Sequence, residues 1–403
     1  MWRLTSLLTK TVEACFRTVS ALIPKDQRLI VFQSVPDYAD NARALHDYVR
    51  TQYPEEWTCV WLVEDRSRVD GLRKHGVIAH YRHSLAALRC LLRARYIVTT
   101  HSSMALLKSP RQVYVNLWHG MPLKAIGYAD ALQEATLLAR LYRIASATDI
   151  IISTSANMRN AMATCFFIDP RRVYIVGQPR NDSLFTPREE AVRKLSTALQ
   201  MEVADRRVIF WLPTFRSGLS RNDGEGIEAA LDLKSLQELS EYLVVTHSLL
   251  VLKLHPLEER FAGQLDVPGI VLLRGEALKE TLTDLYQVLP AADMLITDYS
   301  SAYFDYLLLQ RPIVFFCNDL DSYRARRGFV LEPYEFWTPG PKVTLVSDLV
   351  AELERLRTDS GYYAAERALV NQLVNAQQDD RSSERVFEAM RALGEPGFQA
   401  GAK

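Results

Sequence analysis

The chain has 403 residues, 48% hydrophobic and 24% charged, which is enough apolar material for two or three folded domains. These values exclude an intrinsically disordered chain. The 48 basic residues balance the 48 acidic ones, so the formal net charge is zero. A general attraction to nucleic acid is therefore not expected.

Residues 1–24 predict an amphipathic helix, because Arg3, Lys10 and Arg17 recur at every seventh position. Apolar residues occupy the opposite face, namely Leu4, Leu8, Val12, Cys15, Val19 and Leu22. Charges inside the segment interrupt what would be a signal-peptide core, so secretion is not expected. No apolar run reaches the roughly 18 to 20 residues that span a bilayer. The helix either lies in a membrane interface, with Trp2 as an anchor, or packs on its own domain.

From residue 25 onward, apolar runs alternate with helical patterns. The runs are continuous instead of alternating, which is typical of parallel strands buried on both faces. Strands are expected at 29–35, 57–63, 96–100, 113–118, 149–155 and 173–177, and helices at 42–53, 85–93 and 155–166. This alternation predicts a doubly wound α/β domain over residues 25–190.

A charged helical connector over 187–205 leads to a second series of the same kind, which predicts another α/β domain over 191–380. Its strands are expected at 207–215, 249–256, 269–273, 293–301 and 311–316, with helices from about residue 347. Residues 381–403 are expected to form a last helix and a tail. The polar, Gly-containing stretch 216–226 is the candidate for a mobile lid.

Ligands of open α/β sheets bind beyond the carboxyl ends of the strands, so the polar residues at those ends are the candidates for a site. They are His101, His119, Arg180, Thr214, Arg216, Lys253, His255, Asp298, Ser300 and Ser301. The remaining histidines fall in helical or charged stretches and are expected at the surface: His46, His75, His80, His83 and His247.

Ser300 and Ser301 stand between the strand that ends near Asp298 and an apolar helix. The start of a helix offers free backbone N–H groups and the positive end of its dipole, and serine hydroxyls add donors. These residues therefore form a candidate phosphate cradle, although serine also caps helices that bind nothing. Neither GxGxxG nor a P-loop is present, so no dinucleotide cofactor or P-loop nucleotide is indicated.

Three cationic side chains, Arg216, Lys253 and His255, are expected at similar depth in the second sheet and would suit a diphosphate. Arginine can grip two phosphate oxygens, and a protonated His255 could donate to a departing phosphate. Pro256 stops the strand after His255, so a plain turn histidine is the alternative.

The run "VNLWHGMPLK" ends a strand on His119, between Trp118 and Gly120. Tryptophan would limit the motion of the histidine and exclude water, and glycine lets backbone or ligand come close. A neutral imidazole is the usual general base for a hydroxyl. The interpretation is a base facing a cleft, and the alternative is a histidine with a purely structural role.

Five cysteines occur singly, with no CxxC pair and no metal-type Cys/His cluster. A dispersed, odd set is typical of a reducing compartment, where thiols stay free and serve as small core residues. No metal is therefore expected, with the adjacent pair Asp379 and Asp380 as the one alternative.

Several blocks of the chain, taken together, resemble the CDP-glycerol:glycerophosphotransferase family, the teichoic-acid primases and polymerases and their capsule-polymerase relatives. The blocks follow the family's order and spacing over about 270 residues. They are residues 116–127, 154–185, 212–218, 252–256, 296–316 and 323–329.

The resemblance implies a GT-B-like fold of two Rossmann-type domains facing a central cleft. It implies transfer of a polyol phosphate from a CDP-alcohol (CDP-glycerol or CDP-ribitol) to an acceptor hydroxyl, with release of CMP. The acceptor would be lipid-linked or a polymer, and the enzyme would be peripheral on the cytoplasmic face of the cell membrane. No cofactor and no nucleic acid partner are implied.

The resemblance also assigns residues: His119 and His255 match the family's two essential histidines. Donor-site positions are matched by Arg180, Thr214, Arg216, Ser300, Ser301 and Asp305. In the family's last block Asp379, Ser383 and Arg385 fit, but Asp380 stands where glycine is expected. Two alternatives remain, a GT-B glycosyltransferase that uses a nucleotide sugar and a non-catalytic nucleotide-binding scaffold.

Overall fold

The computed structural model describes residues 2–102, 104–214, 233–259, 266–359 and 361–395. The chain divides into two compact α/β units, each described by itself below. Unit 1 contains the residues up to Gly120, Gln133–Asp182 and the residues from Asp379 onward, and unit 2 contains Met121–Leu132 and Ser183–Gln378.

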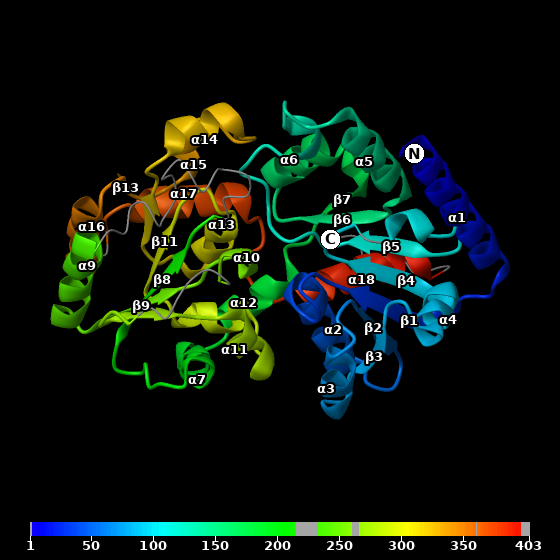
Figure 1. Ribbon diagram of the computed structural model, residues 1–403, viewed down its shortest axis with the longest axis horizontal. Helices are drawn as coiled ribbons and strands as arrows, with labels where there is room; N and C mark the ends of the chain where they lie inside the picture. Colours follow the sequence, from blue (N-terminus) through cyan, green and yellow to red (C-terminus); the bar gives the residue numbers. More distant parts are fainter. Residues whose placement is uncertain (1, 103, 215–232, 260–265, 360, 396–403) are drawn as a thin grey trace. The chain divides into compact units, whose positions relative to one another are not determined.

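Unit 1 is built on a parallel sheet in the order β3-β2-β1-β4-β5-β6-β7, which is the strand order of a Rossmann fold (Figure 1). Its strands are β1 (Asp26–Gln33), β2 (Thr58–Val63), β3 (Ile78–Tyr81), β4 (Ala94–Thr99), β5 (Val113–Asn116), β6 (Ile150–Ser153) and β7 (Val173–Ile175). Its helices are α1 (Trp2–Leu22), α2 (Asp40–Gln52), α3 (Arg68–Lys74), α4 (Leu85–Arg93), α5 (Ala135–Ala147), α6 (Ala156–Phe166) and α18 (Ser382–Gly394).

Unit 2 repeats the plan with a parallel sheet in the order β10-β9-β8-β11-β12-β13. Its strands are β8 (Arg207–Leu212), β9 (Ser248–Leu252), β10 (Ile270–Leu272), β11 (Met294–Thr297), β12 (Ile313–Phe316) and β13 (Lys342–Val343). Its helices are α7 (Arg188–Leu199), α9 (Leu233–Val245), α10 (Pro256–Glu259), α11 (Gly275–Glu280), α12 (Leu285–Val288), α13 (Ala302–Tyr306), α14 (Leu320–Arg326), α15 (Tyr334–Trp337), α16 (Val346–Thr358) and α17 (Ala364–Val374).

The sheets are covered on both faces, which explains why their strands are apolar without interruption. In β1, Val31 packs into a cluster with Leu91 of α4 on one face. On the opposite face Phe32 stacks on Trp61 of β2, where α2 lies. The predicted doubly wound α/β class is therefore confirmed.

Each strand expected from the sequence occurs in the described residues, although most are shorter than the apolar run that predicted them. Two further strands, β3 and β13, were not predicted. Both lie at sheet edges, and β13 has two residues, so neither carries a long apolar signal. Ile78 of β3 is also exposed.

His46 was expected at the surface, and this expectation is wrong. Its side chain is completely buried in α2, where its ring packs edge-on against Phe32 and Tyr38. Burial lowers the pKa of His46, and a bond from its ring to Asp47 opposes that shift. The position completes the buried stripe Ala42, Leu45, His46, Val49, which has helical spacing.

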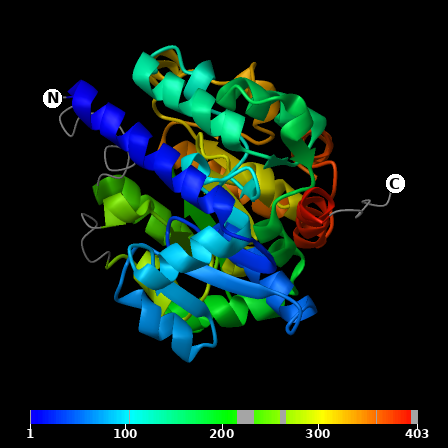
Figure 2. The same cartoon turned by 90° about the vertical axis from the view of Figure 1, so that its right-hand side faces the viewer.

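Helix α1 covers Trp2–Leu22 in the segment where an amphipathic helix was predicted, and it lies beside α5 in unit 1 (Figure 2). Glu13 pairs with Arg143 of α5, and Phe16 packs on the core cluster beneath. The described members of the predicted apolar stripe do not pack on unit 1 and are exposed to solvent: Val12 is 59%, Val19 50% and Leu22 77% exposed. Among the described residues, no helix is long and apolar enough to cross a bilayer.

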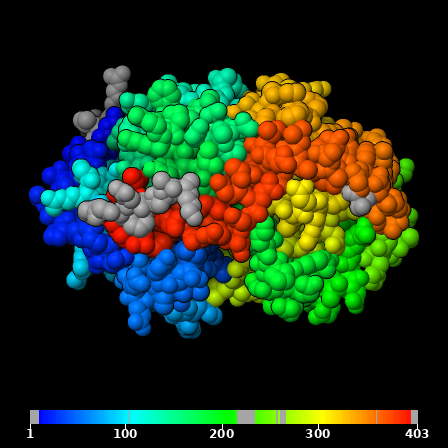
Figure 3. Space-filling view, turned by 180° about the vertical axis from the view of Figure 1, so that it is seen from behind, coloured from blue at the N-terminus to red at the C-terminus, as the bar shows by residue number. Residues whose placement is uncertain are grey.

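Helix α18 returns to unit 1 and lies on its surface, drawn in red in Figure 3. The Asp182 carboxylate accepts the backbone N–H groups of Ser382 and Ser383, both at 2.8 Å. Burial raises the pKa of Asp182, and the bonds from the two serines lower it again. Asp182 thus satisfies the first donors of α18 from a distant part of the chain.

We expect Asp182→Ala to lower the free energy of unfolding by about 1–3 kcal/mol, because two backbone donors at the start of α18 lose their acceptor. Urea unfolding measures this change. The matched control is Asp70→Ala, since Asp70 is exposed and its ion pair with Arg73 spans 3.8 Å. A control that loses as much stability as Asp182→Ala would contradict the assignment.

Candidate functional site

His119 follows β5 on a short backbone turn held between two unusual conformations. Trp118 has φ of 50° and Gly120 has φ of 145°, and both values lie in the region that favours glycine. The Asn116 side chain accepts the Trp118 N–H at 2.9 Å and so closes the turn. The strand ends here because the left-handed backbone at Trp118 cannot continue an extended strand, and the turn carries a half-buried imidazole.

The His119 ring is oriented by hydrogen bonding and by stacking. Its Nδ1 lies 3.2 Å from the carbonyl oxygen of Thr100, which selects the tautomer with the proton on Nδ1. Nε2 is then the basic nitrogen, as a general base requires. The Trp118 ring packs at 4.0 Å between centroids, and the His101 ring stacks at 4.2 Å with an interplanar angle of 8°.

Arg180 was predicted to line the donor site, and the structure places it in unit 1 beneath the His119 turn. Its side chain is buried and pairs with Asp40 at 2.8 Å, and the same Nη1 donates to the carbonyl of His119 at 3.0 Å. Its backbone N–H donates to Asn41, whose amide donates in turn to the Trp118 carbonyl at 3.2 Å. This network supports the backbone of the turn from below.

Sequence reasoning missed three supports of the turn, Asp40, Asn41 and Thr100. Asp40 has φ of 63°, and it and Asn41 open α2 about 80 residues before His119. They resemble any polar start of a helix, so the sequence carried no signal. Thr100 directly precedes His101, and only the pairing of β4 with β5 brings it to His119.

In unit 2, Asp298 joins the ends of two neighbouring strands. Its carboxylate accepts the backbone N–H of Thr214, just beyond β8, at 2.9 and 3.0 Å. It also accepts the N–H groups of Tyr299 and Ser300, beyond β11. β8 and β11 are adjacent at the point where strand order reverses, which is where open α/β sheets bind ligands.

Ser300 and Ser301 stand at the start of α13, as predicted, and both are half-buried. The Ser300 hydroxyl is 3.4 Å from the N–H of Ala302, a long capping bond, and the Ser301 side chain makes no capping bond. Asp305 lies deeper and accepts the Tyr286 hydroxyl at 2.6 Å. The two serines therefore retain hydroxyl capacity for a phosphate, and Asp305 has a partner within the fold.

Lys253 and His255 follow β9. Lys253 pairs with Glu259 of α10, whose carboxylate also accepts the Gly275 N–H at 2.9 Å. Burial lowers the pKa of His255, the charges of Lys253 and Lys124 lower it further, and Glu259 opposes them. An anion bound here would raise that pKa again and so favour a protonated His255.

Lys124 was not predicted as a site residue, although it belongs to a block that carries the family resemblance. It lies in the segment of unit 2 that follows directly after Gly120, and its backbone pairs antiparallel with Phe329. The adjacent Ala125 N–H donates to the carbonyl of Gly328 at 3.0 Å. The part of block 116–127 that follows Gly120 is thus joined to block 323–329 inside unit 2.

The last predicted pair, Asp379 and Arg385, lies at the start of α18 in unit 1. The two side chains form a double ion pair at 2.8 and 3.0 Å, and Arg385 also donates to the Val176 carbonyl. Asp380, where the family's glycine is missing, is exposed. In this arrangement Asp379 and Arg385 secure the helix to the sheet.

Arg216 and the expected lid 216–226 lie outside the described residues. Within the described ranges, no group of three His, Cys, Asp or Glu side chains could hold a metal ion.

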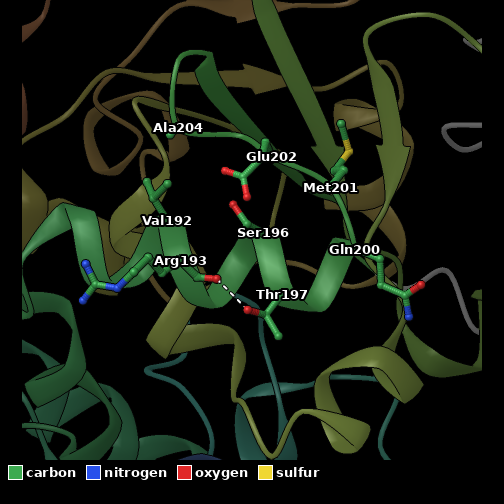
Figure 4. A pocket seen from close by; sticks show the side chains of 8 residues that line it. All are labelled: Val192, Arg193, Ser196, Thr197, Gln200, Met201, Glu202 and Ala204. Carbon is green, nitrogen blue, oxygen red and sulfur yellow. Dashed lines mark hydrogen bonds between the residues drawn. The ribbon is translucent and has the colours of Figure 1, made fainter.

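A surface hollow of about 500 Å³ beside α7 contains none of the predicted site residues (Figure 4). It is lined by Val192, Arg193, Ser196, Thr197, Gln200, Met201, Glu202 and Ala204.

Two Rossmann-type units, each with polar residues at its strand ends, give the chain a GT-B-like fold. The chain belongs to the CDP-Glycerol:Poly(glycerophosphate) glycerophosphotransferase family, whose model matches residues 15–391. It is therefore a phosphotransferase of the CDP-glycerol glycerophosphotransferase type.

Three curated relatives illustrate the range of this family. The chain is 26% identical to a teichoic acid glycerol-phosphate transferase of Staphylococcus aureus, over 95% of this chain and 98% of that one. It is 26% identical to a teichoic acid ribitol-phosphate primase of Bacillus spizizenii, over 95% and 97%. It is 29% identical to a teichoic acid poly(glycerol phosphate) polymerase of Bacillus subtilis, over 87% of this chain and 46% of that longer protein.

Solved structures share the fold. A variant of the wall teichoic acid polymerase TagF with CDPG superposes with a TM-score of 0.80 at 22% identity, over 96% of this chain and 94% of that chain. A UDP-GlcNAc 2-epimerase from Neisseria meningitidis, bound to UDP-GlcNAc, superposes with a TM-score of 0.54 at 12% identity, over 91% and 99%. At these identities the likeness concerns the fold alone.

We expect Arg180→Met to destabilise the protein by about 3 kcal/mol, because it leaves the Asp40 carboxylate without its guanidinium in a largely buried setting. Adding Asp40→Asn to that variant should recover part of the loss. A double-mutant cycle by urea unfolding measures the coupling. If both single variants were as stable as the wild type and only donor affinity fell, Arg180 would bind donor instead of supporting the turn.

Proposed function

We propose that this protein transfers a polyol phosphate, most simply glycerol phosphate, from a CDP-alcohol to a hydroxyl of a lipid-linked or polymer acceptor, with release of CMP. The observation that carries the proposal is the family match over residues 15–391. The curated relatives include both glycerol-phosphate and ribitol-phosphate enzymes, so CDP-glycerol and CDP-ribitol are the two donors to compare. The product would belong to a teichoic-acid-like or capsular polymer.

His119 serves as the general base in this proposal. The acceptor oxygen attacks the β-phosphorus of the donor, the new O–P bond forms, and the bond from phosphorus to the oxygen of CMP breaks. The acceptor proton passes to Nε2 of His119. Support comes from the bond between His119 Nδ1 and the Thr100 carbonyl, which holds the tautomer that this step needs. Trp118 and Gly120 belong to the same turn.

The donor is held by unit 2 in this proposal. The start of α13 with Ser300 and Ser301, joined to Thr214 through Asp298, offers backbone and hydroxyl donors to the diphosphate. Lys253, His255 and Arg216 supply positive charge as CMP departs. Such a transfer depends mainly on positioning and charge stabilisation, so cationic side chains suit its needs.

We expect His119→Ala to lower the rate of CMP release by about 100-fold or more, because a general base contributes at least that much. Donor binding should be preserved, since the donor residues lie in unit 2. A thermal shift with CDP-glycerol at 100 times its dissociation constant should correspond to about 2.7 kcal/mol in both proteins. His83→Ala, at an exposed histidine of unit 1, is the control and should keep the wild-type rate.

A thermal-shift series with CDP-glycerol, CDP-ribitol, CMP, UDP-glucose and UDP-GlcNAc tests the donor class. Stabilisation by CDP-glycerol or CDP-ribitol and by CMP supports the phosphotransferase and identifies the polyol. Stabilisation by UDP-glucose or UDP-GlcNAc alone would overturn it in favour of sugar transfer.

A His119→Ala protein that binds donor and keeps more than about a tenth of the wild-type rate would contradict the proposed role of His119 as the general base.

The proposal extends to the membrane: we infer that α1 places the protein on the cytoplasmic face of the cell membrane, near a lipid-linked acceptor. Support comes from the apolar stripe of α1, whose described members Val12, Val19 and Leu22 are not covered by unit 1. The helix is fastened on another side, through Glu13 and Phe16. An anchored helix with an open apolar stripe and nearby basic residues suits an interface.

We expect the triple variant Val12→Ser, Val19→Ser, Leu22→Ser to bind phosphatidylglycerol-containing vesicles at least about tenfold more weakly than the wild type, because three exposed apolar side chains are lost. Flotation with such vesicles measures the bound fraction. The control is Val244→Ser with Val245→Ser, two exposed valines at the end of α9 in unit 2. Equal flotation of the triple variant and wild type would exclude this role of α1.

A further inference from the structure

Two imidazole rings lie stacked at the carboxyl edge of the unit 1 sheet. β4 and β5 are parallel neighbours, with Thr99 opposite Asn116, so the residues that follow them meet. The His101 and His119 rings are nearly parallel, with 4.2 Å between their centroids and an interplanar angle of 8°. Face-to-face stacking at this spacing fixes the plane of each ring against the other.

Thr100 holds both rings through different atoms. Its hydroxyl is 2.8 Å from Nδ1 of His101, and its carbonyl oxygen is 3.2 Å from Nδ1 of His119. The hydroxyl lies in addition 3.4 Å from the backbone N of Val35, beyond β1. The stack is therefore built into the sheet edge at the point where the strand order of unit 1 reverses, between β1 and β4.

The electrostatic surroundings keep His101 neutral. Burial lowers its pKa, and the Asp40 carboxylate at the start of α2 opposes that shift. Asp40 is itself paired with Arg180, which reaches the same turn from the 3₁₀ segment Pro179–Phe185. His119 also faces His101, and two imidazolium rings at this spacing would repel each other.

We propose that His101 is a positioning residue for His119: its flat, neutral ring fixes the plane of the His119 imidazole and leaves the proton from the acceptor hydroxyl to His119 alone. This inference rests on the proposed role of His119 as the base. His101 contacts neither substrate in this account and acts through its neighbour. A base held in one plane loses less orientation freedom in the transition state.

The test compares His101→Leu, which removes the flat ring, with His101→Phe, which keeps a flat ring that cannot take a proton. We expect kcat to fall about tenfold or more in His101→Leu with KM for CDP-glycerol unchanged, and to stay within about threefold of wild type in His101→Phe. His83→Leu is the matched control, because His83 packs against Tyr81 in the same unit. It should keep the wild-type kcat.

The pH–rate profile supplies the second readout. If His101 stays neutral, the acid limb of kcat has a one-proton slope in the wild type and keeps that slope and position in His101→Phe. A two-proton slope that becomes a one-proton slope in His101→Phe would overturn the neutral role. Melting temperatures are measured alongside, and should His101→Leu fail to fold, His101→Phe and the two slopes decide.

Failure of this inference differs from failure of the proposed function. If His119→Ala is inactive and His101→Leu turns over like the wild type, His119 remains the base and the stack has no part in positioning it. If His119→Ala keeps its rate, the base itself is misassigned and the inference falls with it.

Discussion

The parallel pairing of neighbouring strands is the constraint on which every part of the candidate site depends. The carboxyl ends of parallel strands lie at one edge of the sheet. Residues that are far apart in the sequence are therefore brought close together at that edge. In unit 1 this brings Thr100 and His101 beside His119. In unit 2 it brings Thr214 beside Asp298. The two edges differ in chemistry. The edge of the unit 1 sheet presents imidazoles, and the edge of the unit 2 sheet presents hydrogen-bond donors and cationic side chains.

The His119 turn shows how a strained backbone is held in place. Trp118 occupies a left-handed conformation that a bulky residue adopts at a cost, and it persists because surrounding groups determine it from several sides. Asn41 binds its carbonyl, Asn116 binds its N–H, and Arg180 binds the carbonyl of His119. The backbone of the turn is thus held by three side chains from different segments of unit 1.

Both units include segments that come from far along the chain. The residues after Gly120 belong to unit 2 and pair with Phe329, although His119 belongs to unit 1. Helix α18 belongs to unit 1, where Asp182 caps it, although the chain up to Gln378 belongs to unit 2. One family block, 116–127, is thus divided between the units. The chain therefore runs directly from His119 in unit 1 into the segment of unit 2 that contains Lys124, and unit 2 also contains His255.

The chain alone was sufficient for most of the strands, the alternation of strand and helix, and the family, whereas the roles of His119 and His255 stay predictions. Buried parallel strands are apolar without interruption, and the motif blocks are local in sequence, so both can be read from consecutive residues. The edge strands β3 and β13 were missed because they are short and half-covered. His46 was wrongly expected at the surface because it falls in a polar helical stretch, although its spacing with Leu45 and Val49 places it on the buried face of α2.

Only the tertiary structure decided what each polar residue touches. Arg180 could be read equally as a phosphate ligand or as the partner of a carboxylate, and its pairing with Asp40 required residues 140 positions apart to meet. The stack of His101 on His119 likewise has no sequence signature, since its geometry arises from strand register. Local patterns carry local structure, whereas the ionic and stacking partners of a side chain are set by long-range packing that no single stretch of sequence contains.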